Sequence, residues 1–255
     1  MNTEIKQKIM NELQKIEETE NVKIILAVES GSRAWGFASP DSDYDVRFIY
    51  VRKKIDYLKL NPIRDVIEWR LDEVLDISGW DVKKSLQLLY KSNPTIMEWL
   101  VSPIIYTETK EAEWIKEIQP QYFSIKKSLY HYLHMADSNY QNYLKGDEVR
   151  IKKYLYALRP LLAAQWILDK NSTPPMKFNE LIDAELENEM KPAISQLLEI
   201  KKNVPEMKTS PKITVINEYI EKKWKEIELA AKEIDNKETT WQPLNELFLK
   251  IVNNE

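Results

Sequence analysis

The scarcity of glycine is the feature of this chain that most restricts its fold. Only four of the 255 residues are glycine, whereas average usage of ~7% would give roughly 18. Because glycine supplies most left-handed turns and close backbone approaches, the sequence excludes a collagen and disfavours a turn-rich immunoglobulin-like sandwich. We expect a largely helical protein. Three of the four glycines, Gly31, Gly36 and Gly79, lie early in the chain and mark where the backbone has special demands.

The absence of cysteine removes a further set of functions. Disulfide frameworks, thiolate nucleophiles, iron–sulfur clusters and cysteine-based zinc sites all require a thiol. The only two histidines, His131 and His134, cannot form a three-histidine zinc site within one chain. A net charge of −4 is typical of a mildly acidic globular protein rather than a polybasic nucleic-acid coat.

Membrane and export signals are also missing from the sequence. The first residues are charged and lack an apolar signal core. The most apolar run, 155–168, contains Arg159 and Pro160 and falls short of the ~18 uninterrupted apolar residues of a spanning helix. We therefore expect a cytoplasmic protein that does not bind membranes.

Apolar periodicity predicts strands and helices in the first part of the chain. Residues 3–18 have the spacing of an amphipathic helix. The apolar, β-branched run 22–28 is typical of a central strand buried on both faces. Further elements are expected as strands at 44–51, 66–69 and 74–80, and as a helix capped by Asp81 and continuing through Leu89.

After residue 110, helical patterns replace the strand-like runs. The expected helices cover roughly 124–145, 147–169, 185–202 and 212–235. The sequence therefore predicts an α+β fold in which a small mixed-sheet α/β domain at residues 1–108 precedes an α-helical domain at residues 109–255.

Closely spaced carboxylates open the second expected strand. Residues two apart on a strand project from the same face, about 6.6 Å apart, so Asp43 and Asp45 present two carboxylates side by side, and Asp41 extends the row. Like charges at this distance repel unless a cation joins them. Carboxylate oxygens together with substrate phosphates are what Mg²⁺ binds. The spacing predicts a metal-binding site at the start of this strand.

A Gly-Ser turn directly after the first buried strand is a candidate phosphate-binding loop that would complement the predicted metal site. Gly31 lets backbone N–H groups approach a phosphate closely, and the Ser32 hydroxyl adds a donor. If a helical turn begins at Arg33, its N-terminus adds positive potential there. The Gly31 to Gly36 spacing matches a P-loop, but the lysine that a P-loop requires is absent, and no Rossmann glycine fingerprint is present.

This combination resembles the DNA polymerase β-type nucleotidyltransferase superfamily. The longer motifs are similar to one bacterial and phage branch, the predicted nucleotidyltransferases of the YcgL/RlaP type. The motifs that carry the likeness are Gly31-Ser32-Arg33-Ala34-Trp35-Gly36, Ser39-x-Asp41-Ser42-Asp43-Tyr44-Asp45-Val46-Arg47, Gly79-Trp80-Asp81 and Lys91-Ser92-Asn93-Pro94, with Leu155-x-x-Leu158-Arg159-Pro160 and Trp166 in the later helices.

The resemblance implies roles for individual residues. Asp43 and Asp45 match the metal-binding carboxylates, and Gly31 and Ser32 match the phosphate-contacting turn. A third carboxylate on a neighbouring strand binds the catalytic metal and helps to activate the attacking hydroxyl. Asp76 has the expected hydrophobic flanks and is favoured for this role. Alternatives left open are Asp81, which is more simply a helix N-cap, Glu68 and Asp72.

The implied reaction transfers a nucleoside monophosphate from a nucleoside triphosphate, such as ATP, to an acceptor hydroxyl. The cofactor would be Mg²⁺ in a two-metal site, or Mn²⁺ in its place. An RNA end, a protein and a small molecule all remain open as acceptors, as do the base of the nucleotide and the oligomeric state. The alternative is a module on the same fold that binds a nucleotide or a partner without turnover.

A basic and aromatic stripe is expected on the helix that starts near Val149. Lys152, Tyr156 and Arg159 have i, i+4 and i+7 spacing and share a face. The stripe either faces a triphosphate or an RNA end or is an ordinary solvated surface. The resemblance favours Lys153 and Arg159 as nucleotide-binding residues.

Three further side chains have two interpretations each. Arg33 and Arg47 either stabilise phosphoryl charge or pair with the Asp cluster as ordinary salt-bridge partners. Trp35, like other large aromatics beside small residues, is expected in the core rather than stacked on a base.

Overall fold

The computed structural model describes residues 3–39, 42–70, 74–203 and 209–254. The chain forms two compact units, which are described separately. One unit contains Met1–Ala34, Asp43–Tyr122 and Thr239–Glu255, and the other contains Trp35–Ser42 and Phe123–Glu238. Each unit is therefore built from stretches that are separated in the sequence. The sequence pattern had instead predicted a single domain boundary after residue 108.

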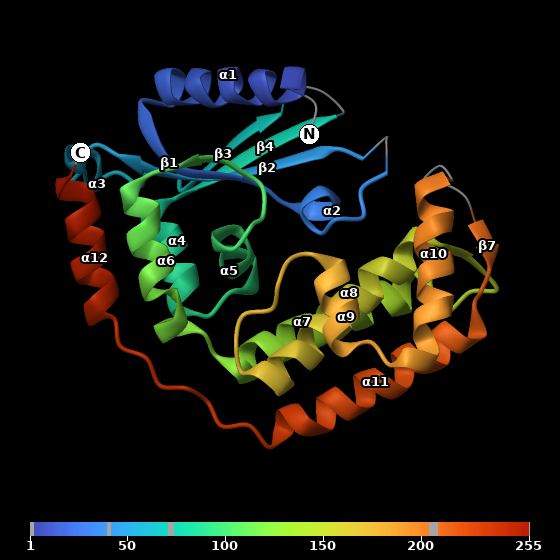
Figure 1. Ribbon diagram of the computed structural model, residues 1–255. Helices are drawn as coiled ribbons and strands as arrows, with labels where there is room; N and C mark the ends of the chain where they lie inside the picture. The colour runs from blue at the N-terminus through green and yellow to red at the C-terminus, as the bar shows by residue number, and fades with distance from the viewer. Residues whose placement is uncertain (1–2, 40–41, 71–73, 204–208, 255) are drawn as a thin grey trace. The chain divides into compact units, whose positions relative to one another are not determined.

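A mixed five-stranded sheet forms the centre of the first unit, with the strand order β3-β4-β2-β1-β5 (Figure 1). β2 is parallel to β4, and the remaining neighbours are antiparallel. The strands are β1 (Val22–Glu29), β2 (Tyr44–Arg52), β3 (Val66–Arg70), β4 (Leu75–Asp81) and β5 (Ile105–Glu108). The expected α+β class is confirmed, with β5 as a short edge strand that the sequence analysis did not identify.

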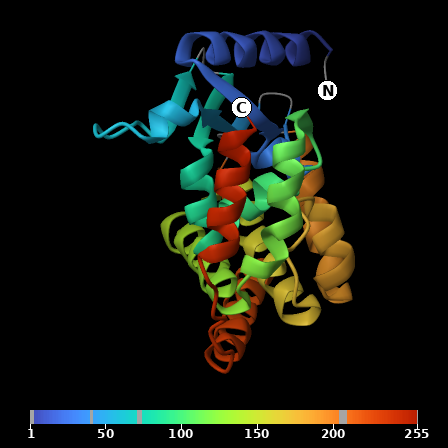
Figure 2. The ribbon, with the colours of Figure 1, turned by 90° about the vertical axis from the view of Figure 1, so that its left-hand side faces the viewer.

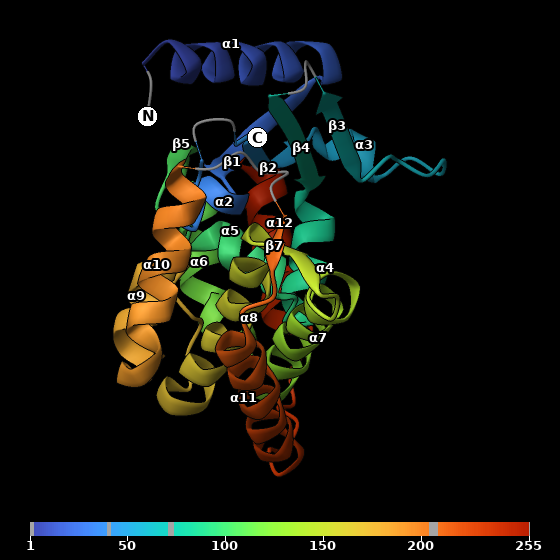
Figure 3. The same ribbon diagram turned by 90° about the vertical axis from the view of Figure 1, so that its right-hand side faces the viewer.

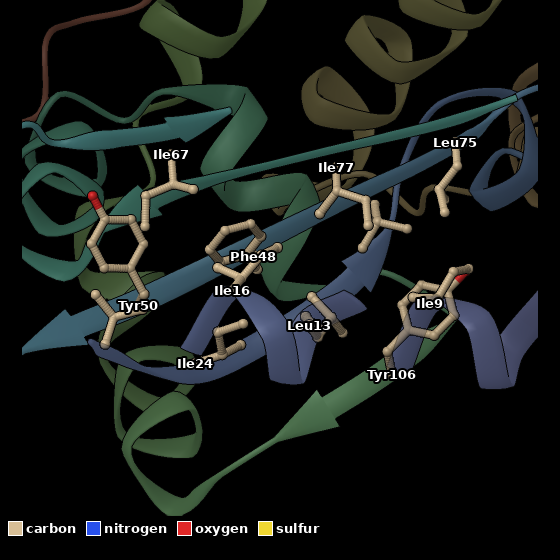
Figure 4. Packing of buried hydrophobic residues seen from close by; sticks show 13 residues of the cluster. Ile9, Leu13, Ile16, Ile24, Phe48, Tyr50, Ile67, Leu75, Ile77 and Tyr106 are labelled. Atoms are coloured by element: carbon tan, nitrogen blue, oxygen red, sulfur yellow. The ribbon is translucent and has the colours of Figure 1, made fainter. Parts of the chain in front are cut away.

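Helices cover both faces of this sheet. Figure 2 shows α1 on one side and α4, α6 and α12 on the other. α1 brings Ile9, Leu13 and Ile16 against Ile24, Phe48 and other sheet residues, and these side chains are nearly inaccessible (Figure 4). The helices of this unit are α1 (Thr3–Glu20), α2 (Gly31–Ala34), α3 (Lys54–Tyr57), α4 (Val82–Tyr90), α5 (Pro94–Leu100), α6 (Lys110–Tyr122) and α12 (Gln242–Asn253).

Local signals explain where several of these elements begin. β1 is buried at every position but one, as its apolar composition predicts. α4 begins after Asp81, whose carboxylate accepts a hydrogen bond from the Lys83 backbone N–H at 2.8 Å, so the predicted N-cap is confirmed. Gly79 lies under the Phe48 ring, and a Cβ there would be 2.2 Å from a ring carbon.

The second unit is largely helical. α7 and α8 pack against each other, and α11 lies alongside both (Figure 3). Its elements are α7 (Ile125–Tyr143), β6 (Glu148–Arg150), α8 (Lys152–Lys170), α9 (Phe178–Glu185), a 3₁₀ turn (Asn188–Met190), α10 (Lys191–Asn203), β7 (Thr209–Pro211) and α11 (Thr214–Lys232).

One expectation for this unit was wrong. The chain forms a short strand at Glu148–Arg150, paired antiparallel with Thr209–Pro211, where a helix from residue 147 was expected. α8 consequently begins at Lys152. The Asp147 carbonyl accepts a hydrogen bond from the Lys212 N–H at 3.0 Å, so pairing with a distant segment overrides the local helical pattern.

Among the helices that the structure describes, none has the length and apolarity needed to cross a membrane.

Candidate functional site

The parallel pairing of β2 and β4 places two predicted site residues side by side. Asp45 and Asp76 are register partners on these neighbouring strands, so their side chains lie on the same face of the sheet. Arg47 lies two residues farther along β2 and shares that face. The sequence had indicated Asp76 through the family resemblance, and the strand register explains how it reaches Asp45.

The guanidinium of Arg47 connects the two carboxylates. Its Nη2 donates to Asp45 Oδ1 at 3.0 Å and to Asp76 Oδ2 at 2.9 Å. Its Nη1 donates to the backbone carbonyls of Val46 and Asp76, each at 3.1 Å. Of the two interpretations of Arg47, the structure therefore contains the ion pair, with both acids sharing one nitrogen.

The Gly-Ser turn packs directly against Asp45. Gly31 has a φ of +58°, and a Cβ at this position would lie 2.1 Å from Asp45 Oδ2. The Ser30 N–H donates to the Asp45 carbonyl at 2.8 Å, which ties the turn to β2. Ser32 is buried within the short helix α2. The turn thus needs glycine for both its backbone angle and its contact with the carboxylate.

Arg33 is held beside the start of β2. Its Nε donates to the Asp43 carbonyl at 2.9 Å, and its guanidinium carbon lies 3.6 Å from the centre of the Tyr44 ring. Asp43 itself is exposed just before β2. The first unit therefore brings together Gly31, Ser32, Arg33, Asp43, Asp45 and Asp76.

Glu29 is a buried carboxylate that the sequence analysis did not single out. It is fully inaccessible, and it accepts hydrogen bonds from the Asp45 N–H at 2.8 Å and from the Tyr106 hydroxyl. Burial raises the pKa of Glu29 above its usual range. The sequence does show an acidic residue at the end of an apolar strand, next to the Gly-Ser turn, which could have indicated a site residue. Its hydrogen-bond partner Tyr106 lies on β5, far away in sequence.

Electrostatics make the carboxylate pair receptive to a cation. Burial raises the pKa of Asp45, the Arg47 guanidinium opposes this, and the negative charges of Asp76 and Asp43 raise the pKa further. Because one guanidinium faces two carboxylates, the formal charge of this trio is negative. A cation would relieve the remaining repulsion.

The donor set fits Mg²⁺ only in part. Within the described ranges, no group of three or more His, Cys, Asp or Glu side chains is arranged to hold a metal ion. Asp45 and Asp76 nevertheless supply hard oxygen ligands already gathered around a cationic group, and Mg²⁺ is usually held by one or two carboxylates with substrate phosphates. The three-carboxylate site with Asp43 stays a prediction.

The alternatives for the third carboxylate occupy other places. Asp81 caps α4 and also accepts a hydrogen bond from the Tyr57 hydroxyl at 3.0 Å. Glu68 is on β3, in register with Ser78. Asp72 and Asp41 lie outside the described residues.

The remaining predicted residues, Lys153 and Arg159, belong to the second unit. Arg159 is buried, its guanidinium carbon is 4.5 Å from the centre of the Trp35 ring, and its Nε donates to the Met176 carbonyl at 3.3 Å. Lys153 Nζ lies 3.9 Å from the centre of the Tyr143 ring, and burial lowers the pKa of Lys153. In this unit both cations contact aromatic rings, and their nucleotide-binding role stays a prediction.

Comparison with known proteins establishes the family. Residues 5–250 match the family described as "RlaP: RNA repair pathway DNA polymerase beta family". The chain belongs to this family. It is also 47% identical over 251 residues to the protein described as "Uncharacterized protein YcgL" from Bacillus subtilis (strain 168), and the match covers 97% of this chain and 96% of the relative. The expected resemblance to the YcgL/RlaP branch is confirmed.

A solved structure gives a weaker likeness. It is described as a nucleotidyltransferase-like protein from Exiguobacterium sibiricum 255-15, and it matches with a TM-score of 0.32 and 14% identity. The match covers 89% of this chain and 74% of that chain.

Proposed function

We propose that the protein is a metal-dependent nucleotidyltransferase that moves a nucleoside monophosphate from a nucleoside triphosphate to an acceptor hydroxyl. The register pairing of Asp45 with Asp76 next to the Gly31 turn is the observation that carries the proposal. This arrangement supports the proposal because two carboxylates, the kind of ligand that Mg²⁺ prefers, lie beside a turn whose glycine allows close backbone approach.

The residues of the first unit divide the work. Asp43, Asp45 and Asp76 would hold Mg²⁺ or Mn²⁺, which when bound lowers the pKa of the acceptor hydroxyl and neutralises charge on the pyrophosphate. The Gly31 turn and the Ser32 hydroxyl donate hydrogen bonds to phosphate oxygens. Arg33 contributes positive charge beside them.

The transfer itself exchanges a phosphoanhydride bond of the triphosphate for a phosphoester bond to the acceptor. The acceptor oxygen bonds to the α-phosphorus, the bond from that phosphorus to the bridging oxygen breaks, and pyrophosphate leaves. The acceptor proton passes to the Asp76 carboxylate. No thiol or imidazole is required, in agreement with the lack of cysteine and the scarcity of histidine in the chain.

The acceptor and the additional nucleotide contacts rest on the family. Because the matching family is described as an RNA repair pathway family, an RNA end is the acceptor class that we propose first. Lys153 and Arg159 are proposed as further phosphate contacts, with Lys153 favoured because Arg159 is fully buried.

Transfer of α-labelled nucleotide to RNA ends tests the proposal. The wild type should transfer label with Mg²⁺, and Asp45→Asn and Asp76→Asn should each lower the rate by about 10³-fold or more, as expected for loss of metal assistance. Asp65→Asn is the matched control, since Asp65 pairs with Lys84 on the surface. Full activity in both site variants would refute the assignment.

A binding module without turnover is the second candidate. It is favoured by the presence of a guanidinium, rather than an open set of three carboxylates, at the centre of the site. Thermal shift measurements with each triphosphate separate the two: stabilisation that is equal with and without Mg²⁺, with no label transfer, favours the module. Stabilisation that needs Mg²⁺ favours the enzyme.

A further inference from the structure

Arg47 is held at two different kinds of acceptor. Its Nη2 contacts one oxygen each of Asp45 and Asp76, while its Nη1 contacts two backbone carbonyls. The carbonyl contacts do not depend on the carboxylates. Part of the guanidinium is therefore anchored to the strands, and part of it neutralises the acids.

The Nη2 contacts use the oxygens that a divalent cation would use. Metal–oxygen bonds near ~2.1 Å are much shorter than the N–H···O distances to Nη2, and two cations on the same pair of oxygens repel each other. The opposite oxygen of Asp45 faces Gly31, where even a methyl group would collide with it. A metal that binds this pair therefore competes with Arg47.

A purely structural ion pair does not explain the arrangement well. The acids remain partly open to solvent, with 32% of the Asp45 side chain and 46% of the Asp76 side chain exposed, whereas Arg47 is 18% exposed. Two carboxylates facing one guanidinium also leave a net negative charge. The two carboxylates are stabilised by the Arg47 guanidinium, but a divalent cation with a higher charge can replace it.

We propose that Arg47 is an exchangeable counter-cation, which holds Asp45 and Asp76 together before metal binding and moves to a phosphate oxygen of the nucleotide when the metal takes its place. This rests on the proposed function and adds a positioning residue to it. Arginine suits the exchange because its planar fork binds carboxylates and phosphates with the same geometry.

Mn²⁺ binding to the full-length, nucleotide-free protein tests the competition. Free Mn²⁺ is measured by electron paramagnetic resonance for the wild type, Arg47→Gln, Arg47→Lys and the control Arg64→Gln, whose arginine pairs with Glu20 on the surface. Arg47→Gln should bind Mn²⁺ about tenfold more tightly or better, since a competing charge is removed. Arg47→Lys and Arg64→Gln should stay near the wild type. Equal or weaker binding by Arg47→Gln would overturn the proposal.

A measurement on the wild type covers the case in which Arg47→Gln does not fold. Side-chain nuclear magnetic resonance of the Arg47 guanidinium should show a chemical-shift change when Mg²⁺ is added with a nonhydrolysable triphosphate. A signal unchanged at saturation would also overturn the proposal.

The failures of the two proposals are distinguishable. If the wild type transfers nucleotide but neither Arg47 measurement responds, only the exchange is wrong. If Arg47→Gln tightens Mn²⁺ binding while the wild type transfers no nucleotide, the enzyme assignment is wrong and the competition for the carboxylates stands.

Discussion

At the scale of single residues, Gly31 has little freedom to change. Its φ of +58° disfavours any side chain, and a Cβ added to Gly31 would lie 2.1 Å from Asp45 Oδ2. Gly36 also has a positive φ, +82°, but a Cβ there would meet nothing within 4 Å. Alanine at either glycine would therefore strain the backbone, but only alanine at Gly31 would also displace the Asp45 carboxylate.

This difference gives a prediction for the pair of alanine variants. Both Gly31→Ala and Gly36→Ala should lose about 1–3 kcal/mol of unfolding free energy through backbone strain. Only Gly31→Ala should also lose nucleotide transfer, by about tenfold or more, because Asp45 must move. Urea unfolding and the label-transfer assay measure the two effects. Equal loss of activity in both variants would contradict the role of the Gly31 contact.

The buried carboxylate of Glu29 predicts a pH dependence. Burial raises the pKa of Glu29, so the folded protein binds this proton more tightly than the unfolded chain. Stability from this group is therefore greatest at low pH and falls as pH rises from the ordinary value of 4.5 through the higher folded pKa.

Glu29→Gln should remove that dependence, since an amide does not titrate. The unfolding free energy of the variant minus that of the wild type should increase with pH across this window, as measured by urea unfolding at a series of pH values. Shifts at Asp45 and Asp81 largely cancel because both proteins contain these groups. A difference that is constant with pH would show that Glu29 is not responsible.

The sequence alone led to several of these residues but not to all. Asp43 and Asp45 are close in sequence, so strand geometry was enough to predict that their carboxylates lie side by side; because β2 begins at Tyr44, that pairing stays a prediction. Glu29 depends on Tyr106, which only the pairing of β1 with β5 brings near. Likewise, the sequence left Arg47 with two interpretations because its second acid, Asp76, comes from another strand.

At the scale of elements, long patterns were predictable and short paired ones were not. α1, β1, β2 and α4 carry their own periodicity and caps. The pairing of β6 with β7 joins segments separated by three helices and a 3₁₀ turn, so neither strand contains a sufficient local signal. β5, at four residues, is short enough to be defined mainly by its neighbour β1.

The C-terminal helix α12 supplies a prediction at this scale. Ile251 is buried at 1% exposure, whereas Leu249 on the same helix is 58% exposed. Ile251→Ala should lower the unfolding free energy by about 2–5 kcal/mol, and Leu249→Ala should change it by no more than about 0.5 kcal/mol. Chemical denaturation followed by circular dichroism compares them. A similar effect of both substitutions would mean that α12 does not pack against the first unit.

At the scale of the whole molecule, the family match covers nearly all of the residues that make up the two compact units. The match from residue 5 to residue 250 includes segments of both units. The change in sequence texture near residue 108 did not reveal that 239–255 belongs with the sheet. The sequence of such a segment does not indicate which unit it packs against, because amphipathic helices have the same apolar pattern wherever they pack.

The return of α12 to the first unit also has a consequence for synthesis on the ribosome. α12 contacts α4, α6 and β2, yet residues 123–238 must be translated before it. At ~5–20 residues per second, one face of the sheet waits on the order of 10 s for its last helix. During that interval the nascent chain exposes the apolar surface that α12 later covers.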